Sequence, residues 1–538
     1  MTAGRARAAV ALICAASALT LVLLGTRLTF FGDDWAFLLE RPGFTASALL
    51  RDHNGHLSVL PVLIYKLLVA LFGLDSQLPF RLVLSLSVTA VGALTYALVS
   101  ERAGRIAGLV AATLLMFLGP AWNDLLWSFQ IGLVGSLATG LGALLALERD
   151  TRRRNAASCV LLVLSLALSD LGIPFCVAAA IAVALRRRAA QAWIPLVPLA
   201  LFGLWYAAYG HAAPSAFSSS NVLALPGYVL DAAASGIASL TGFAREGWFG
   251  NTTAWGRPLL GVALAGTLVW FLRGGRASPR VLIFLGGALT FWILAGANFT
   301  LGRQPVSSRY QLVHVTFLLL IAAELFGPLR LGRRGSALAI AIALVALGSN
   351  LSALGYGFRF MREHADNARA DLGALEITRV TVPPGFRLVE PVAQDAFLPD
   401  VTAGRYFAET AAHGSPAWSP REIAAASARA RQAADSVVVA AHGIRLLPAR
   451  RPASRRGCRQ LRAPVDTPAL QGGSLVTNRG AAPVGVGVRR FAGPERPRAL
   501  GALPPGATAR IAIPRDSVAI PWHVTGRSSS GRLQVCPA

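Results

Sequence analysis

The chain has 538 residues, of which 54% are hydrophobic and 14% are charged, and its formal net charge is +25. This composition excludes an ordinary soluble globular protein and indicates that much of the chain lies in a lipid bilayer. The positive charge does not indicate a nucleic-acid-binding protein, because the arginines of the first two thirds occur in short clusters between apolar blocks. Such clusters are typical of the cytoplasmic loops of membrane proteins.

The apolar blocks predict about eleven transmembrane helices, since a helix needs about 20 residues to cross about 30 Å of hydrocarbon. Arg5 and Arg7 precede a first block that resembles an uncleaved signal anchor, which places the N-terminus in the cytoplasm. Later basic clusters lie at residues 102–105, 149–154, 186–188, 273–280 and 330–334, and we expect all of them to be cytoplasmic. The predicted spans are residues 8–29, 82–99, 106–118, 131–147, 156–168, 173–185, 193–209, 258–272, 281–297, 311–326 and 337–354.

This alternation places the remaining segments on the external side of the membrane. The apolar stretch 57–74 must not cross, so we interpret it as juxtamembrane or re-entrant. The external loops are then residues 30–81, 121–130, 210–257 and 298–310, and the C-terminal region faces the same side. We therefore expect a transmembrane domain over residues 1–355 and an extracytoplasmic soluble domain over residues 356–538.

The C-terminal domain has the pattern of a β-rich α+β fold. Ser419 to Glu422 form a predicted capping box with proline at the first helical position, and the helix should run to about Ala434. Short runs at residues 436–441, 474–478, 484–491, 508–514 and 533–536 are predicted strands. Residues 445–462 are interpreted as a basic, poorly ordered connection.

The five cysteines show no spacing typical of a metal site. Cys14, Cys159 and Cys176 fall in predicted membrane helices, where we expect inert thiols. Cys458 and Cys536 can form a disulfide if the C-terminal domain faces an oxidising compartment.

Asp33 and Asp34 follow the first predicted span directly. One interpretation is that they cap a short helix, because acids favour the positive end of a helix. The other is that one of them is a general base, with or without a bound metal, because a carboxylate beside low dielectric has a tunable pKa.

Two histidines, His53 and His56, lie in the same predicted loop together with Asp52. With Asp33 or Asp34 they could hold a divalent cation, since imidazole and carboxylate suit several metals. Their spacing is not a zinc signature, and histidines that cap a juxtamembrane helix are an equally good interpretation.

Three further candidates lie in the later external loops. Asp124 lies between Trp122 and Trp127. The tryptophans are expected in an interfacial aromatic belt, so Asp124 is the candidate site residue of this loop. Arg303 and Arg309 can bind a phosphate through their guanidinium groups, or can merely reach toward lipid headgroups. His314 and Glu324 lie within a predicted span but are left out of the predicted site.

The order of these features resembles the GT-C superfamily of membrane glycosyltransferases, which includes protein mannosyltransferases, aminoarabinose transferases and mycobacterial arabinosyltransferases. The acidic pair Asp33-Asp34 resembles that of the family's first external loop, and the stretch from His56 to Pro61 resembles the one that leads into a juxtamembrane helix. Asp124 resembles the acid of the second external loop. Arg303 and Arg309 resemble the late arginines near the lipid-phosphate site. His56 to Pro61 departs from the mannosyltransferases' His-Pro-Pro.

The resemblance implies a plasma-membrane glycosyltransferase that moves a sugar from a polyprenyl-phosphate carrier to a glycan, lipid or protein acceptor, with inversion. Asp33 or Asp34 would act as the base and Arg303 or Arg309 would stabilise the departing phosphate. A lipid or polysaccharide transporter or flippase is an alternative, although it should show internal repeats, and we find none. A non-catalytic envelope glycan-assembly protein is a further alternative.

Overall fold

The computed structural model describes residues 2–210, 216–244, 254–327, 332–388, 398, 401–450, 457–469, 472–514, 516, 518–528 and 531–537. The chain divides into two compact units. The helical unit comprises Met1–Thr26, Pro42–Leu68 and Leu78–Met361, and the C-terminal unit comprises Arg27–Arg41, Val69–Gln77 and Arg362–Ala538. The boundary drawn along the chain from sequence, at residue 355, therefore misses two short N-terminal segments that pack with the C-terminal region.

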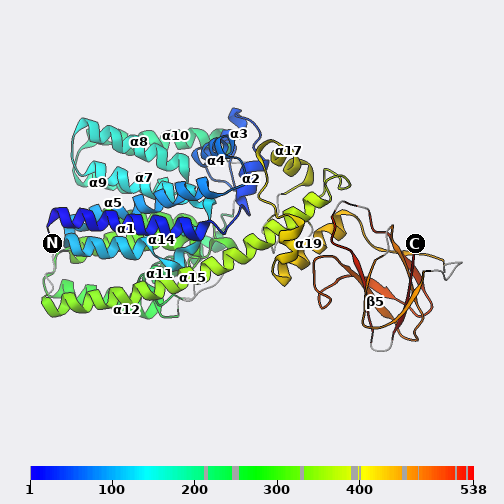
Figure 1. Cartoon of the computed structure of the whole chain (residues 1–538). Helices are drawn as coiled ribbons and strands as arrows, with labels where there is room; N and C mark the ends of the chain where they lie inside the picture. The colour runs from blue at the N-terminus through cyan, green and yellow to red at the C-terminus, as the bar shows by residue number, and fades with distance from the viewer. Residues whose placement is uncertain are drawn as a thin grey trace. The chain divides into compact units, whose positions relative to one another are not determined.

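The helical unit is a bundle whose long helices lie side by side (Figure 1). Seven helices are long and apolar enough to cross a membrane, and four shorter ones are also apolar. Leucines such as Leu12, Leu19 and Leu23 point outward, at 72%, 60% and 59% exposure, as expected for a bundle surrounded by lipid. The helices are α1 Ala3–Gly25, α3 Ala46–Leu50, α4 Val59–Phe72, α5 Leu78–Met116, α6 Trp122–Leu126, α7 Ile131–Leu147, α8 Arg152–Leu168, α9 Gly172–Leu185, α10 Trp193–Trp205, α11 Ser219–Thr241, α12 Gly256–Leu272, α13 Val281–Ala297, α14 Ser308–Phe326 and α15 Arg333–Ile377.

One end of the bundle collects basic clusters that are far apart in the sequence. Glu324 on α14 pairs with Arg102 at 3.1 Å and with Arg280 at 3.2 Å, and Arg280 also contacts Glu148. Arg188 pairs with Asp150 next to them. We call this the Glu324 end. The opposite end, which carries α6, the turn between α8 and α9, and residues 298–307, is the Asp124 end. This grouping agrees with the predicted alternation of spans.

Helix α5 is two antiparallel helices joined at a break. Gly104 has φ +85° and ψ 165°, a conformation that only glycine adopts at low cost. The chain folds back there, so that Gly92 contacts Met116. The two arms match the predicted spans 82–99 and 106–118, with Arg102 and Arg105 at the turn between them.

Helix α11 lies in the predicted external segment 210–257, of which residues 211–215 and 245–253 lie outside the described residues. Its first turn contacts the end of α13, where Asn221 donates to the carbonyls of Ala297 and Phe299 at 3.3 and 3.2 Å. Its last turn contacts the start of α14, where Ser239 donates to Gln311 at 2.8 Å. Length and composition would allow α11 to cross a bilayer, but both of its ends contact the Asp124 end. It therefore lies across that end.

The C-terminal unit contains helices and two antiparallel sheets. Its helices are α2 Asp33–Leu39, α17 Ala403–His413, α18 Pro420–Ala425 and α19 Ala428–Ala441, together with the last turns of α15. One sheet has the strand order β1-β7-β4-β9-β2 and the other the order β3-β8-β5-β6. Gly526 of one sheet lies against Leu533 of the other, so the sheets pack face to face. The strands are β1 Leu446–Pro448, β2 Arg459–Arg462, β3 Val465–Pro468, β4 Ser474–Asn478, β5 Val484–Arg489, β6 Arg498–Leu503, β7 Thr508–Ile511, β8 His523–Arg527 and β9 Arg532–Pro537.

Several sequence predictions for this unit need correction. The capping box of Ser419 and Glu422 is present, but its helix ends at Ala425, because Ser427 caps a second helix. The predicted strand 436–441 is part of that helix, α19, where Val437 and Val438 are buried. The predicted span 337–354 lies within α15, which continues to Ile377. Cys458 and Cys536 form a disulfide, while residues 451–456 of the predicted connection lie outside the described residues.

Candidate functional site

The acidic pair stands at the start of α2 in the C-terminal unit. Asp34 is fully buried, and its Oδ2 accepts hydrogen bonds from the Phe31 backbone N–H at 3.1 Å and from Gln77 Nε2 at 3.3 Å. Asp33 is half-buried. The two carboxylates therefore differ: Asp34 stabilises the loop before α2, and Asp33 is more accessible. Both lie in the first turn of α2, whose N-cap is Gly32, without a side-chain cap hydrogen bond.

His53 and His56 are the two ends of a tight hairpin turn in the helical unit. Their backbone groups exchange hydrogen bonds of 3.0 and 2.9 Å. The turn residues Asn54 and Gly55 have φ of +53° and +82°, as a type I′ turn requires, and Asn-Gly is the preferred sequence for such a turn. Asp52 Oδ2 accepts from the Gly55 N–H at 3.0 Å and reinforces the turn.

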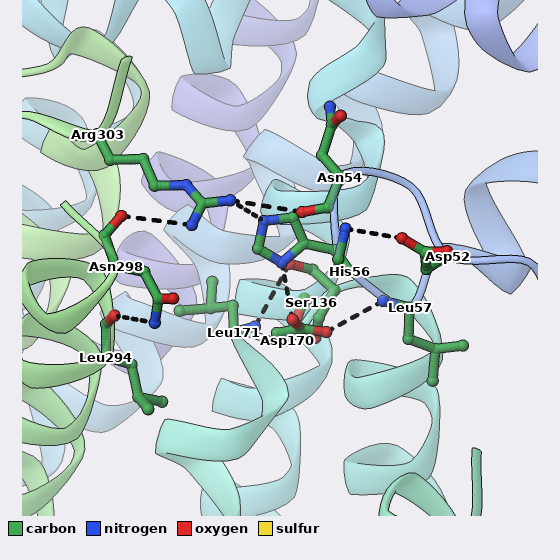
Figure 2. Close-up of polar contacts among 12 residues, drawn as sticks. Asp52, Asn54, His56, Leu57, Ser136, Asp170, Leu171, Leu294, Asn298 and Arg303 are labelled. Carbon is green, nitrogen blue, oxygen red and sulfur yellow. Dashed lines mark hydrogen bonds and ion pairs between the residues drawn. The ribbon is translucent and has the colours of Figure 1, made fainter. Parts of the chain in front are cut away.

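The His56 side chain joins a polar cluster with Asp170 and Arg303 (Figure 2). Its Nδ1 lies 2.7 Å from Asp170 Oδ2, and its Nε2 lies 3.2 Å from Arg303 Nη2. Asp170 Oδ1 also accepts from the Leu57 backbone N–H at 3.1 Å. The His56 side chain is 45% exposed, so the cluster is open to a ligand. We call these three residues the His56 cluster.

These contacts define one arrangement of protons on the His56 ring. Guanidinium nitrogens only donate and an ionised carboxylate only accepts. His56 therefore donates from Nδ1 to Asp170 and accepts from Arg303 at Nε2, which we assign from the network. Both ring nitrogens are occupied by protein groups in this arrangement.

Residues 302–307 hold Arg303 at the cluster and are themselves fixed by buried side chains. The Pro305 carbonyl accepts from Ser235 at 3.1 Å, from Gln311 at 3.2 Å and from His314 Nε2 at 3.0 Å. Tyr228 donates to the Arg303 carbonyl at 3.0 Å. His314, which we left out of the predicted site, thus supports this loop from inside α14. The guanidinium of Arg303 is consequently presented from a well-anchored backbone.

A cavity of about 420 Å³ opens beside the same loop. Its lining is mainly apolar and comes from α11, the end of α13 and residues 299–306. Tyr228, Gly296, Phe299 and Pro305 are among the lining residues, and Asp231 adds one carboxylate.

Asp124 and Arg309 are neighbours at the Asp124 end. The Asn123 backbone N–H donates to Ser308 Oγ at 3.1 Å, which joins α6 to the first turn of α14. Burial raises the pKa of the Asp124 carboxyl well above its usual range, and the positive Arg309 and the Leu312 backbone N–H oppose this effect. Asp124 has no exposed surface, and Arg309 is the charged group that most strongly opposes the effect of its burial.

The structure thus brings the predicted residues together in two groups within the helical unit, His56 with Arg303 and Asp124 with Arg309. Asp33 and Asp34 belong to the other unit. The His53 ring packs on Phe129, with ring centres 5.4 Å apart. Among the described residues there is no group of three or more histidines, cysteines or acids arranged to hold a metal ion.

Sequence reasoning missed Asp170. It lies in the short turn between α8 and α9, which were predicted as adjacent spans, and the turn itself was not considered. A carboxylate in a tight turn between two apolar helices is costly near lipid unless it has a partner. An acidic residue between two predicted spans, at the same end of the bundle as His56, was therefore the sequence signal that could have identified Asp170.

Comparison of the chain with protein-family models, with curated proteins and with solved structures finds no match. The site must therefore be interpreted from its own chemistry.

Proposed function

We propose that the protein is a membrane glycosyltransferase that moves a sugar from a polyprenyl-phosphate carrier to an acceptor hydroxyl, with inversion at the anomeric carbon. The observation that carries this proposal is the His56 cluster. His56 and Arg303 are 247 residues apart in the sequence and were singled out separately, yet their side chains are 3.2 Å apart. Their contact brings together two of the residues through which the chain resembles GT-C enzymes, and this supports the proposal.

Arg303 is the better candidate to bind the donor phosphate. Arg309 lies near the fully buried Asp124, whereas Arg303 belongs to the partly exposed His56 cluster. Arg303 contacts an imidazole nitrogen and the backbone carbonyls of Asn54 and Asn298, none of which is negative. A guanidinium fits phosphate oxygens well, and such a preorganised cation stabilises the charge that develops on a leaving phosphate.

Asp33 is the better candidate for the base. The buried Asp34 already accepts two hydrogen bonds, whereas the half-buried Asp33 has more surface from which to receive a proton. A single base opposite the leaving group suffices for an inverting transfer. In this proposal Asp33 removes the acceptor's hydroxyl proton as the oxygen attacks the anomeric carbon. The phosphate leaves with the bonding electrons.

The topology belongs to the same proposal. We propose about eleven spans in the plasma membrane, with a cytoplasmic N-terminus and an extracytoplasmic C-terminal unit. The arginines gathered at the Glu324 end support this orientation, because basic residues favour the cytoplasmic side. The apolar cavity beside Arg303 offers room for part of a lipid chain near the phosphate-binding guanidinium.

The test is sugar transfer by the purified protein, with radiolabelled polyprenyl-phosphate sugars as donors and envelope extract as the acceptor source. We expect transfer by the wild type, and a loss of about 100-fold or more for Asp33→Asn, as for a missing general base. Asp34→Asn should also lose activity, through a disordered loop. Full activity of both variants would refute the catalytic assignment. Lipid movement without transfer would favour a flippase.

A further inference from the structure

The acidic loop is packed into the C-terminal unit by a buried aromatic pair. Trp35, directly after Asp34, is fully buried, and its Nε1 donates to the Phe30 carbonyl at 3.1 Å. Its ring stands edge-on to Tyr406 of α17, with centres 5.6 Å apart. A seven-residue helix such as α2 is too short to be stable alone, so these contacts determine its position.

Tyr406 is fixed in turn by a polar network. Its hydroxyl donates to Glu376 Oε1 at 2.8 Å and lies 2.9 Å from Ser415 Oγ. Ser415 also donates to Glu376. These groups come from the last turn of α15, from α17 and from the residues that follow α17. A connected network of this kind, partly shielded from water, favours one arrangement of its members.

The same segment also holds the partner of Asp34. The Ser415 backbone N–H donates to Asp75 Oδ1 at 2.8 Å, and the Leu74 N–H donates to the His413 carbonyl at 2.7 Å. These bonds fix residues 69–77, which end in Gln77, the donor to Asp34. Residues 413–415 are therefore connected to the acidic pair through two series of contacts. One runs through Tyr406 and Trp35, and the other through Asp75 and Gln77.

We infer that Tyr406 is a positioning residue for the acidic pair, and that Glu376, Tyr406 and residues 413–415 are an integral part of the candidate active site. Tyr406 touches neither carboxylate and acts through Trp35. The catalytic consequence rests on the proposed function, whereas the positioning itself does not. An error of about 1 Å in the position of a reacting group can reduce a rate about 100-fold, so this network can control turnover.

The positioning is tested by hydrogen–deuterium exchange on full-length protein in detergent. Tyr406→Phe removes the hydroxyl and keeps the ring against Trp35, and Tyr406→Ala removes both. We expect faster exchange in the peptide containing residues 30–40 for Tyr406→Phe, and a larger increase for Tyr406→Ala. Unchanged exchange in both variants would overturn the inference, whatever the enzyme's activity.

The catalytic consequence is tested with the same variants in the transfer assay. Tyr406→Phe should reduce kcat about tenfold and leave the KM for the lipid donor unchanged, because the donor phosphate is bound elsewhere. Asp435→Asn is the control, since Asp435 accepts from the backbone N–H groups of Arg490, Phe491 and Ala492 in the same unit. If Tyr406→Phe and Asp435→Asn lose equal activity per folded molecule, general destabilisation explains the loss and the inference fails. If exchange rises but the wild type transfers no sugar, the positioning holds and only the proposed function fails.

Discussion

At the residue scale, the carboxylate of Asp170 orients two groups, the His56 ring and the backbone of Leu57. Asp170→Asn keeps the size of the side chain but removes its charge. The amide nitrogen would face His56 Nδ1 and favour the other tautomer, which places an N–H against Arg303. We expect sugar transfer to fall about 10- to 100-fold, as for other residues that orient a functional imidazole.

Glu363→Gln is the control for Asp170→Asn. Glu363 pairs with Arg429 at 2.7 Å, and the two side chains are 49% and 45% exposed. Exposed pairs contribute little, so this variant should keep near wild-type transfer. Equal activities of the two variants would show that Asp170 does not support the site.

A second residue-scale prediction concerns the pH dependence of stability. Burial alone would raise the pKa of Asp516, but hydrogen bonds from Arg490 and from the Val518 N–H, with the charge of Arg490, hold that pKa below its usual value. Its stabilising effect is therefore present above the unfolded-state pKa of about 3.9 and is lost as the pH falls through the folded-state pKa. Asp516→Asn also leaves the buried Arg490 without its partner, at a cost of about 3 kcal/mol.

The measurement is thermal unfolding of the full-length protein at several pH values. Asp516→Asn should have a lower melting temperature than the wild type at pH 7. The difference between the two melting temperatures should decrease below about pH 4. Glu363→Gln removes an exposed pair with Arg429 and should change little at either pH. A gap that does not change with pH would contradict the role of Asp516 ionisation.

At this scale the sequence could predict which residues are candidates for a site, but not their partners. His56 and Arg303 were found because polar groups in external loops are conspicuous beside apolar spans. Their contact depends on how loops far apart in the chain pack, and so does the burial of Asp34 and Asp124. Periodicity and composition contain no information about such packing.

At the element scale, apolar length predicted the helices well, and α7 and α13 have the predicted bounds. Helix α11 was missed because it includes Pro226 and Asp231 and lies across the bundle end, where a uniformly apolar sequence is not required. The three valines from Val437 to Val439 favour a strand locally, but the cap at Ser427 and burial of the whole run favour a helix. Strands β2, β6 and β8 contain Arg or Gly, and β3 contains Asp and Pro. None of the four shows a strong local strand pattern, so their pairing depends on the packing of the two sheets.

Gly119 provides an element-scale prediction about packing of α15. A Cβ at this position would collide with the Asn350 carbonyl oxygen and the Leu354 backbone nitrogen. Gly119→Ala should therefore destabilise the protein by about 3 kcal/mol, since neither backbone can move without repacking. Gly261→Ala on α12 is the control, because nothing lies within 4 Å of its Cβ. The check is the melting temperature in detergent, and equal values for both variants would contradict this close packing.

At the scale of the whole molecule, the chain comprises an apolar helical bundle with polar clusters at both ends and a β-sandwich unit that incorporates the acidic loop. The disulfide between Cys458 and Cys536 suits an oxidising compartment and agrees with the proposed external placement. The arginines of the Glu324 end suit the cytoplasmic side. Both features fit the topology that we propose.

The central claim is tested most directly by sugar transfer in sealed vesicles of known orientation, with a radiolabelled polyprenyl-phosphate sugar as donor and a membrane-impermeant acceptor. The account predicts labelled product when the acceptor is on the side of the C-terminal unit, and no product with Asp33→Asn. Transfer from the opposite side, or transfer that Asp33→Asn leaves unchanged, would contradict it.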